Sequence, residues 1–245
     1  TLWSGIEWVT STGSTNADLA TRARSGAPEG AVRISDEQTR GRGRLARTWM
    51  SPAGASISMS VLLKPSHGPE AWGWLSLLAG MAIAEALEEL APDGVAVELK
   101  WPNDVLIDGR KVCGILSERI EQPDGARAVV GMGINLALTA EQLPVPNATS
   151  LLLAGFDVRP VEVVAGVLTH FERLYRRWQY DADVRVEYRR RCASIGTELR
   201  IVTSETETVP GRGVGVDRFG RLLVDVAGRE RAFAVGDVIH ARLPR

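Results

Sequence analysis

Hydrophobic and polar positions change period several times along the chain, and each change marks a new element. Residues 55–64 alternate with a period of two, which is typical of a strand with one buried face. Residues 126–138 form another apolar run that contains the glycines of GMGINL, so a strand is expected there. Residues 69–90 are long and apolar and carry a proline at their start, which predicts a helix.

Turn and capping residues divide the chain between these segments. The small polar side chains Ser14, Thr15 and Asn16 stand ahead of a short helix that Gly26 can end. Pro102 ends a strand, and the dipeptide Asp108–Gly109 is typical of a tight hairpin turn. Further strands are expected at 31–39, 93–102 and on both sides of the turn within 104–120, and further helices at 160–180 and 184–192.

The pattern changes at about residue 194. From there the chain shows only short alternating runs separated by turn signals, and this spacing predicts a small antiparallel barrel of roughly fifty residues. We therefore expect an α+β protein with a mixed β-sheet flanked by helices over residues 1–193, followed by a small β-barrel over 194–245.

Composition narrows the function. The 245 residues are 44% hydrophobic and carry a net charge of −1, so no overall basic field favours nucleic acid or an anionic membrane. The apolar stretch 71–87 is too short and mixed to span a bilayer. Two cysteines show neither zinc spacing nor a disulfide framework, so a cytoplasmic protein is expected.

One loop concentrates positive charge. Four arginines fall between Arg40 and Arg47, with Gly41 and Gly43 among them and Trp49 close behind. Guanidinium groups match carboxylate and phosphate oxygens, glycines allow close approach, and an indole can stack on a planar base. A single-stranded nucleic-acid contact would use the same residue types. Neither a GxGxxG nor a GxxxxGK[ST] pattern occurs, so the common nucleotide-binding motifs are unsupported.

Two further motifs carry chemistry. The stretch KWPND, residues 100–104, and Lys111 contain two of the three lysines of the chain. An ammonium group suits a carboxylate or a transferring phosphate, although a solvated hairpin would have the same polar residues. In GMGINL the glycines allow close approach, and Asn135 offers an amide.

Taken in order, GSTN, DEQTRGRGRLARTW, KWPNDVLIDGRKVCGILSE and VVGMGINL resemble the biotin protein ligases. The resemblance is strong over residues 8–135 and weaker through the later helices, and the tail resembles the SH3-like barrel of these enzymes. It implies the class II synthetase or biotin–lipoate ligase type of fold.

The resemblance also implies a set of site residues. Biotin would be bound by Ser14, Thr15, Asn16, Gln38, Arg42, Gly43, Arg44, Lys111 and Gly114. ATP would be bound by Arg44, Arg47, Trp49, Asn103, Lys111 and Asn135. Arg42, Arg44 and Lys111 would be the catalytic residues. Asp104 is the candidate magnesium ligand, and a plain turn residue is as good an interpretation of it.

The implied reaction has two steps, in which ATP and biotin form biotinyl-5'-AMP and a carrier lysine then accepts biotin. The cofactors would be biotin, ATP and Mg²⁺, and the partner the biotin carboxyl carrier domain of acyl-CoA carboxylases. Because a mixed anhydride hydrolyses readily, we expect the arginine loop to be open without ligand and to close over the adenylate.

Several alternatives stay open. A lipoate ligase shares this fold and the adenylation chemistry, and a nucleic-acid-binding module could use an Arg-Gly loop. Fewer than ten residues precede WVTSTGSTN, so the resemblance implies the monofunctional type without an N-terminal DNA-binding domain. No partnership with nucleic acid or a membrane is expected, and the chain is expected to be a monomer or a weak homodimer.

Overall fold

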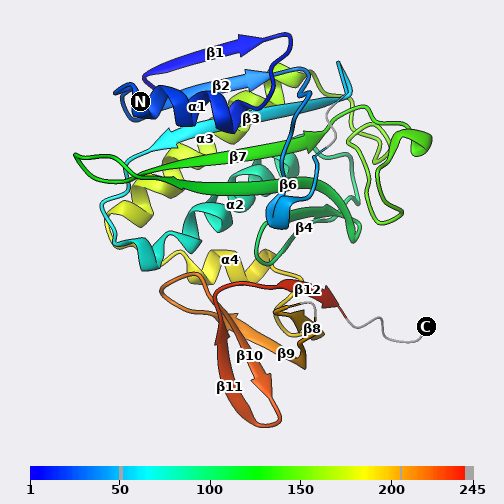
Figure 1. The fold of residues 1–245 in the computed structure, drawn as a ribbon. Coiled ribbons are helices and arrows are strands. Elements are labelled where there is room, and N and C mark those ends of the chain that lie inside the picture. The colour runs from blue at the N-terminus through cyan, green and yellow to red at the C-terminus, as the bar shows by residue number, and fades with distance from the viewer. Residues whose placement is uncertain (50–51, 205, 241–245) are drawn as a thin grey trace.

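A mixed seven-stranded sheet forms the centre of the computed structural model, which describes residues 1–49, 52–204 and 206–240 (Figure 1). Its strand order is β1-β2-β3-β7-β6-β5-β4. Only β1 and β2 pair in parallel, and the other neighbours are antiparallel. The strands are β1 (Gly5–Val9), β2 (Ala31–Ser35), β3 (Ser56–Leu63), β4 (Val97–Lys100), β5 (Asp104–Ile107), β6 (Arg110–Ile120) and β7 (Arg127–Asn135).

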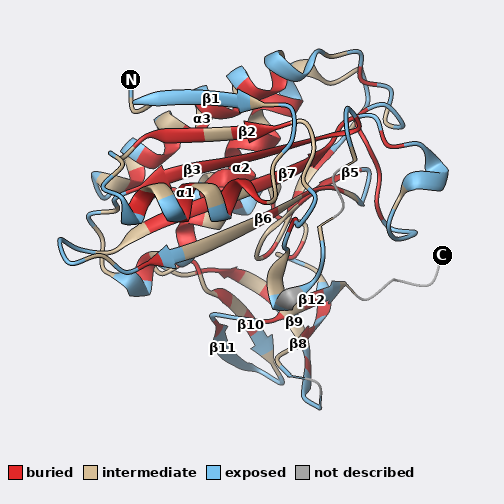
Figure 2. Ribbon diagram, turned by 45° about the horizontal axis from the view of Figure 1, so that its top comes forward, coloured by how far each residue is buried: buried red, intermediate tan, exposed pale blue. Residues whose placement is uncertain are grey.

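Helices cover both faces of this sheet. The apolar helix α2 and the amphipathic α3 pack together against one face, where the main core lies, and α1 packs on the other face (Figures 1 and 2). All eight residues of β3 are buried, because helices lie on both sides of it. The helices are α1 (Thr15–Arg24), α2 (Gly73–Leu90), α3 (Pro160–Gln179) and α4 (Arg185–Arg191), with short 3-10 turns η1 (Arg44–Ala46), η2 (Pro69–Ala71) and η3 (Ala140–Gln142).

The C-terminal segment forms a second, five-stranded antiparallel sheet in the order β11-β10-β9-β8-β12. Buried indole groups tie it to the main body, since Trp74 Nε1 and Trp101 Nε1 donate to the carbonyls of Arg218 and Gly220, each at 3.0 Å. The second sheet confirms the predicted strands, and closure of its edges into a barrel stays a prediction. Its strands are β8 (Glu198–Val202), β9 (Thr208–Val216), β10 (Leu222–Val226), β11 (Arg229–Phe233) and β12 (Asp237–His240).

The structure confirms most predicted elements, including the hairpin turn, where Asp108 and Gly109 both have positive φ. The predicted strands 31–39 and 93–102 are shorter in the structure, and two further differences concern β1 and the start of α2. Strand β1 was not predicted, because it lies exposed at the sheet edge and its residues show no alternation in burial. The helix predicted from Pro69 begins as a 3-10 turn, and α2 starts only at Gly73. Within the described residues, no helix is long and apolar enough to cross a membrane.

Candidate active site

A cavity of about 590 Å³ lies between the arginine loop, strands β6 and β7, and strand β12 of the C-terminal sheet. The structure brings every site residue predicted from the sequence to its wall. These residues are Ser14, Thr15, Asn16, Gln38, Arg42, Gly43, Arg44, Arg47, Trp49, Asn103, Asp104, Lys111, Gly114 and Asn135. The motifs are spread over more than a hundred positions of the sequence, so their convergence is a property of the fold.

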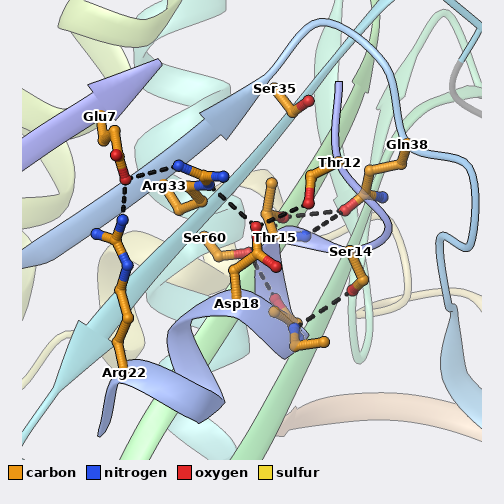
Figure 3. Close-up of polar contacts among 12 residues, drawn as sticks. Glu7, Thr12, Ser14, Thr15, Asp18, Arg22, Arg33, Ser35, Gln38 and Ser60 are labelled. Carbon is orange, nitrogen blue, oxygen red and sulfur yellow. Dashed lines mark hydrogen bonds and ion pairs between the residues drawn. The ribbon is translucent and has the colours of Figure 1, made fainter. Parts of the chain in front are cut away.

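The N-terminus of α1 forms one part of the wall with neutral hydrogen-bonding groups. Ser14 is the N-cap of this helix, and its side chain accepts from Ala17 N at 3.4 Å. Gln38 Oε1 accepts from Thr15 N at 2.8 Å and from Thr15 Oγ1 at 3.0 Å (Figure 3). Ser14, Thr15 and Asn16 are buried, so their orientation is fixed by the helix start and by Gln38.

Ser60, on the central strand β3, contacts this cluster. Its hydroxyl lies 2.7 Å from Thr15 Oγ1 and 2.6 Å from Asn16 Oδ1 (Figure 3). Gly131 on β7 leaves room for Asn16, because a Cβ there would lie 2.1 Å from Asn16 Oδ1. The sequence interpretation missed Ser60. The sequence signal for Ser60 was its polar position in the period-two alternation of this strand. In the structure every residue of the strand is buried.

Asp18 links the α1 cluster to the segment that carries Gln38. Its Oδ2 accepts from Thr12 Oγ1 at 2.8 Å and from Arg33 Nε at 3.0 Å (Figure 3). Thr12 in turn forms a parallel bridge with Gln38. The carboxylate therefore holds the chain just before the helix and the chain that supplies Gln38 in one arrangement.

The arginine loop, residues 40–49, is folded as a narrow hairpin between β2 and β3. Arg42 and Thr48 form an antiparallel bridge, and Gly43 N donates to Arg47 O at 2.7 Å. A Cβ at Gly41 would lie 2.5 Å from Trp49 O, so the close approach of these two chain segments requires glycine. Arg42 lies at the rim of the cavity with 54% of its side chain exposed, and it pairs with Glu118.

Arg44 points from this hairpin towards the C-terminal sheet. It donates to Asn103 Oδ1 at 3.1 Å and to Gly236 O at 3.4 Å, and it lies 3.7 Å from Asp237 Oδ1. Burial lowers the pKa of Arg44, and the negative charges of Asp237 and Asp104 oppose that shift. Arg47 pairs with the same Asp237 at 2.5 Å. Two arginines of the loop are thus held by one carboxylate of β12.

The indole of Trp49 lies against the glycines of the central strands. A Cβ at Gly133 of β7 would fall 2.4 Å from the ring, and one at Gly114 of β6 would fall 2.9 Å from it. Lys111 Nζ lies 5.8 Å from the ring centroid. Trp49 Nε1 is buried and has no hydrogen-bond partner among the described residues. The absence of side chains at Gly114 and Gly133 therefore allows the aromatic ring to pack directly on the two strands.

Lys111 and Asp104 form an ion pair within the cavity, with Nζ and Oδ1 2.5 Å apart. Backbone hydrogen bonds fix the lysine, since Lys111 N donates to Asn147 O and its carbonyl accepts from Thr149 N, each at 2.8 Å. The Asp104 side chain is 17% exposed. Among the described residues no group of three or more His, Cys, Asp or Glu side chains could hold a metal ion. A single carboxylate is nevertheless enough for Mg²⁺ that arrives on substrate phosphates.

The two predicted asparagines are both engaged with the chain. Asn103 uses its Oδ1 for Arg44 and its Nδ2 for Ile115 O at 2.9 Å. Asn135 is 3% exposed, and its Nδ2 donates to Thr149 O at 2.9 Å. Asn103 therefore positions Arg44. Asn135, at the end of β7, holds the neighbouring segment that contains Thr149. Cys113, buried beside this region, has a thiol pKa raised by burial, as expected for a packing residue.

Further wall residues were not predicted. Those from the C-terminal sheet are Val202, Asp237, Val238 and Ile239, and those from the segment after β7 are Pro144, Val145, Asn147 and Ala148. The stretch NATSL, residues 147–151, resembles the family only weakly, and the turn GD at 236–237 looks like any other turn of the tail. Their role depends on docking of the second sheet, which the sequence alone does not show.

The site combines two chemistries. Lys111, Arg44 and Arg47 present positive charge in one cavity, which suits phosphate and carboxylate groups. The α1 cluster presents hydroxyl and amide groups, which suit a neutral polar ring because a buried unpaired polar group costs about 1–3 kcal/mol. The cavity can therefore bring two anions together while it holds a neutral ring.

Comparison with known proteins agrees with this geometry. The biotin/lipoate A/B protein ligase family matches residues 8–135. The chain is 40% identical to a biotin--[acetyl-CoA-carboxylase] ligase of Mycobacterium tuberculosis, with 98% of this chain and 90% of that protein covered. It is 35% identical to the bifunctional ligase/repressor BirA of Bacillus subtilis over 83% of this chain, and it spans only 64% of that protein. A biotin protein ligase from Aquifex aeolicus, solved in complex with biotin and ATP, superposes with a TM-score of 0.81 at 26% identity, covering 98% of this chain and all of that one. The chain belongs to the biotin/lipoate A/B protein ligase family.

Proposed function

We propose that the cavity performs both steps of biotin transfer, and that the chain is a biotin protein ligase. In the first step the carboxylate of biotin attacks the α-phosphorus of ATP and releases pyrophosphate. In the second step a carrier lysine attacks the acyl carbon of biotinyl-5'-AMP and releases AMP. The observation that carries the proposal is the convergence of Lys111 and Arg44 with the neutral α1 cluster in one cavity. The 40% identical ligase relative supports it.

The residue roles follow from position and charge. Thr15, Asn16 and Gln38 would bind the ureido ring, since they supply paired donors and acceptors in a buried site. Lys111 would leave Asp104 to contact the carboxylate and the reacting phosphate. Arg42 and Arg44 would stabilise the negative charge that develops on the α-phosphate. Ser14, Gly43 and Gly114 would shape the pocket for biotin.

The base of ATP would stack on the indole of Trp49, whose ring atoms lie close to Gly114 and Gly133. Asn135 would line the nucleotide pocket, while Arg47 and Asn103 would lie near the phosphates. Asp104 would hold Mg²⁺ together with phosphate oxygens once Lys111 has moved away. Bound there, the ion would neutralise phosphate charge.

Closure of the arginine loop would keep water from the adenylate between the two steps. Two rim contacts, Arg42 with Glu118 and Arg47 with Asp237, already hold the hairpin over the cavity in this structure, which differs from the open loop expected from the sequence. These contacts would break to admit the substrates and form again over the adenylate.

The acceptor would be the biotin carboxyl carrier domain of an acyl-CoA carboxylase, in line with the name of the Mycobacterium tuberculosis relative. We place the enzyme in the cytoplasm, where ATP is available and where Cys113 and Cys192 would stay free. We divide the chain into a catalytic domain, 1–193, and a C-terminal domain, 194–245. We propose that the chain acts as a monomer or weak homodimer.

The test is to mix purified protein with ATP, Mg²⁺, biotin and a carrier domain, and to detect biotinylated carrier by mass. Lipoate in place of biotin is the control. Transfer of biotin but not lipoate supports the proposal, and the opposite preference would assign the chain to the lipoate ligases. Salt-dependent nucleic-acid binding without ATP turnover would overturn both assignments.

A further inference from the structure

Glu118 on β6 lies outside the cavity wall and connects two parts of it. Its Oε2 accepts from Asn16 Nδ2 at 2.7 Å, and its Oε1 accepts from Arg42 Nη2 at 3.1 Å. The same Arg42 nitrogen lies 3.4 Å from Oε2. One carboxylate therefore receives donors from the α1 cluster and from the arginine loop.

Among the residues that the structure describes, neither donor nitrogen has an equivalent second acceptor. Asn16 Nδ2 also donates to Leu116 O at 3.2 Å, which is longer than its contact with Glu118. The side chain of Arg42 is 54% exposed and lies in a loop with two glycines. Fixing this side chain in one conformation therefore costs conformational entropy. Glu118 is only 27% exposed and belongs to the long central strand β6, so it offers a fixed point to both.

The negative charge of Glu118 lies beside a site that must bring two anions together, where a carboxylate is unfavourable by itself. The carboxylate repels substrate anions, so it is a cost unless it organises the cations of the site. Arg42 neutralises the charge of Glu118, and the remaining lone pairs of the carboxylate accept from the amide of Asn16. The geometry therefore gives Glu118 a use that a neutral residue would not fulfil.

We propose that Glu118 is a positioning residue that holds Arg42 closed over the bound ring and thereby keeps water from the adenylate. This inference rests on the proposed ligase function. Loss of the charge releases Arg42, and the loop then opens more often. Water attacks the acyl carbon of biotinyl-5'-AMP in those intervals, breaks the bond to the phosphate oxygen, and gives free biotin and AMP instead of biotinylated carrier.

The two contacts of Glu118 are separable by substitution. In Glu118→Gln an amide oxygen still accepts from Asn16, while the ion pair with Arg42 is lost. In Glu118→Ala both contacts are lost. Because Asn16 keeps a hydrogen-bond acceptor in Glu118→Gln and loses it in Glu118→Ala, we expect the KM for biotin to rise about tenfold or more in the alanine variant and to change less in the glutamine variant.

The decisive readout is the ratio of AMP released to carrier biotinylated, measured with purified full-length protein at saturating ATP and limiting carrier. We expect a ratio near one in the wild type and a several-fold excess of AMP in both Glu118 variants. The matched control is Glu121→Gln, which breaks an exposed pair with Arg119 just beyond the end of the same strand. It is expected to behave as the wild type.

A double-mutant cycle tests whether Glu118 acts through Arg42. In an Arg42→Ala background, Glu118→Gln is expected to add no further AMP excess. Independent effects of the two substitutions, or a wild-type ratio in Glu118→Gln and Glu118→Ala, would overturn the inference. If the wild-type protein fails to biotinylate the carrier, it is the proposed function that fails, so the two failures are distinguishable.

Discussion

Lys111 and Asp104 neutralise each other in the cavity, with 2.5 Å between Nζ and Oδ1. The lysine emerges from β6 and the aspartate from the start of β5, so the pair lies across two adjacent strands of the sheet. An ammonium group that is already paired with a carboxylate can exchange that partner for an anionic substrate. The pair therefore neutralises the charge of Lys111 until an anionic substrate takes the place of Asp104.

Removal of the lysine charge should stop the first step. We expect Lys111→Met to lower the rate of pyrophosphate release at least about 100-fold, the usual cost of losing one charge-stabilising group. It should also destabilise the fold, since it leaves the buried Oδ1 atom of the partly buried Asp104 without its charged partner. Lys111→Arg keeps a charge and should recover stability better than activity. Normal pyrophosphate release from Lys111→Met would remove the lysine from the mechanism.

The packing of Trp49 against Gly133 gives a second prediction. In Gly133→Ala the new methyl group would meet the indole at 2.4 Å and displace it. Overpacking of this kind costs about 1–3 kcal/mol. We therefore expect the KM for ATP to rise about tenfold, with a smaller change in the KM for biotin.

Gly215→Ala is the matched control, because it places the same methyl group in a strand where the nearest heavy atom is 3.8 Å away. It should leave both KM values unchanged. An unchanged KM for ATP in Gly133→Ala would show that the position of the indole does not matter for binding the base.

The sequence marked residues that the fold brings to one cavity wall, and it predicted the fold class and most of the strands around that wall. Motif residues such as Lys111 and Gln38 are recognisable because their chemistry is tied to short local patterns. Strand β1 was missed because it is only five residues long and lies almost wholly exposed at the sheet edge, without a run of core residues to mark it. Asp237 was missed because its role arises only when the C-terminal sheet docks. Ser60 was missed for a related reason, since its partners Thr15 and Asn16 lie more than forty residues away.

Asp237 connects the C-terminal sheet to the arginine loop, and its substitution tests whether the second sheet takes part in the reaction. In Asp237→Asn both Arg44 and Arg47 lose their charged partner. We expect trypsin to cleave faster within the loop and the KM for ATP to rise about three- to tenfold, because the pair with Arg44 is partly buried. Saturating biotin and ATP should slow cleavage in the wild type.

Glu230→Gln, an exposed change on β11 of the same sheet, serves as the control for Asp237. A fall in the KM for ATP in Asp237→Asn would contradict the expected role, since it would show that the carboxylate competes with the phosphates. Loop cleavage that biotin and ATP leave unchanged would argue against closure.

His240 gives a prediction about pH. Its Nε2 lies 2.9 Å from Ser194 Oγ, which accepts from Trp101 N at 3.2 Å, so the histidine lies where the two sheets meet. The pKa of His240 is lowered by burial and, to a lesser extent, by the positive charge of Lys100. Since the folded protein holds this proton less tightly than the unfolded chain, the contribution of His240 to stability is fully present above the unfolded pKa, about 6.5. That contribution is lost as the pH falls below this value towards the folded pKa.

In His240→Gln this pH-dependent part is absent, because glutamine does not titrate, while its amide oxygen can still accept from Ser194. Thermal unfolding of the wild type should therefore lose more Tm between pH 7.5 and 5.5 than unfolding of the variant. His67 and His170 are present in both proteins, so the difference between the two proteins reports on His240 alone. Equal losses of Tm in the two proteins would mean that protonation of His240 is not linked to the junction between the sheets.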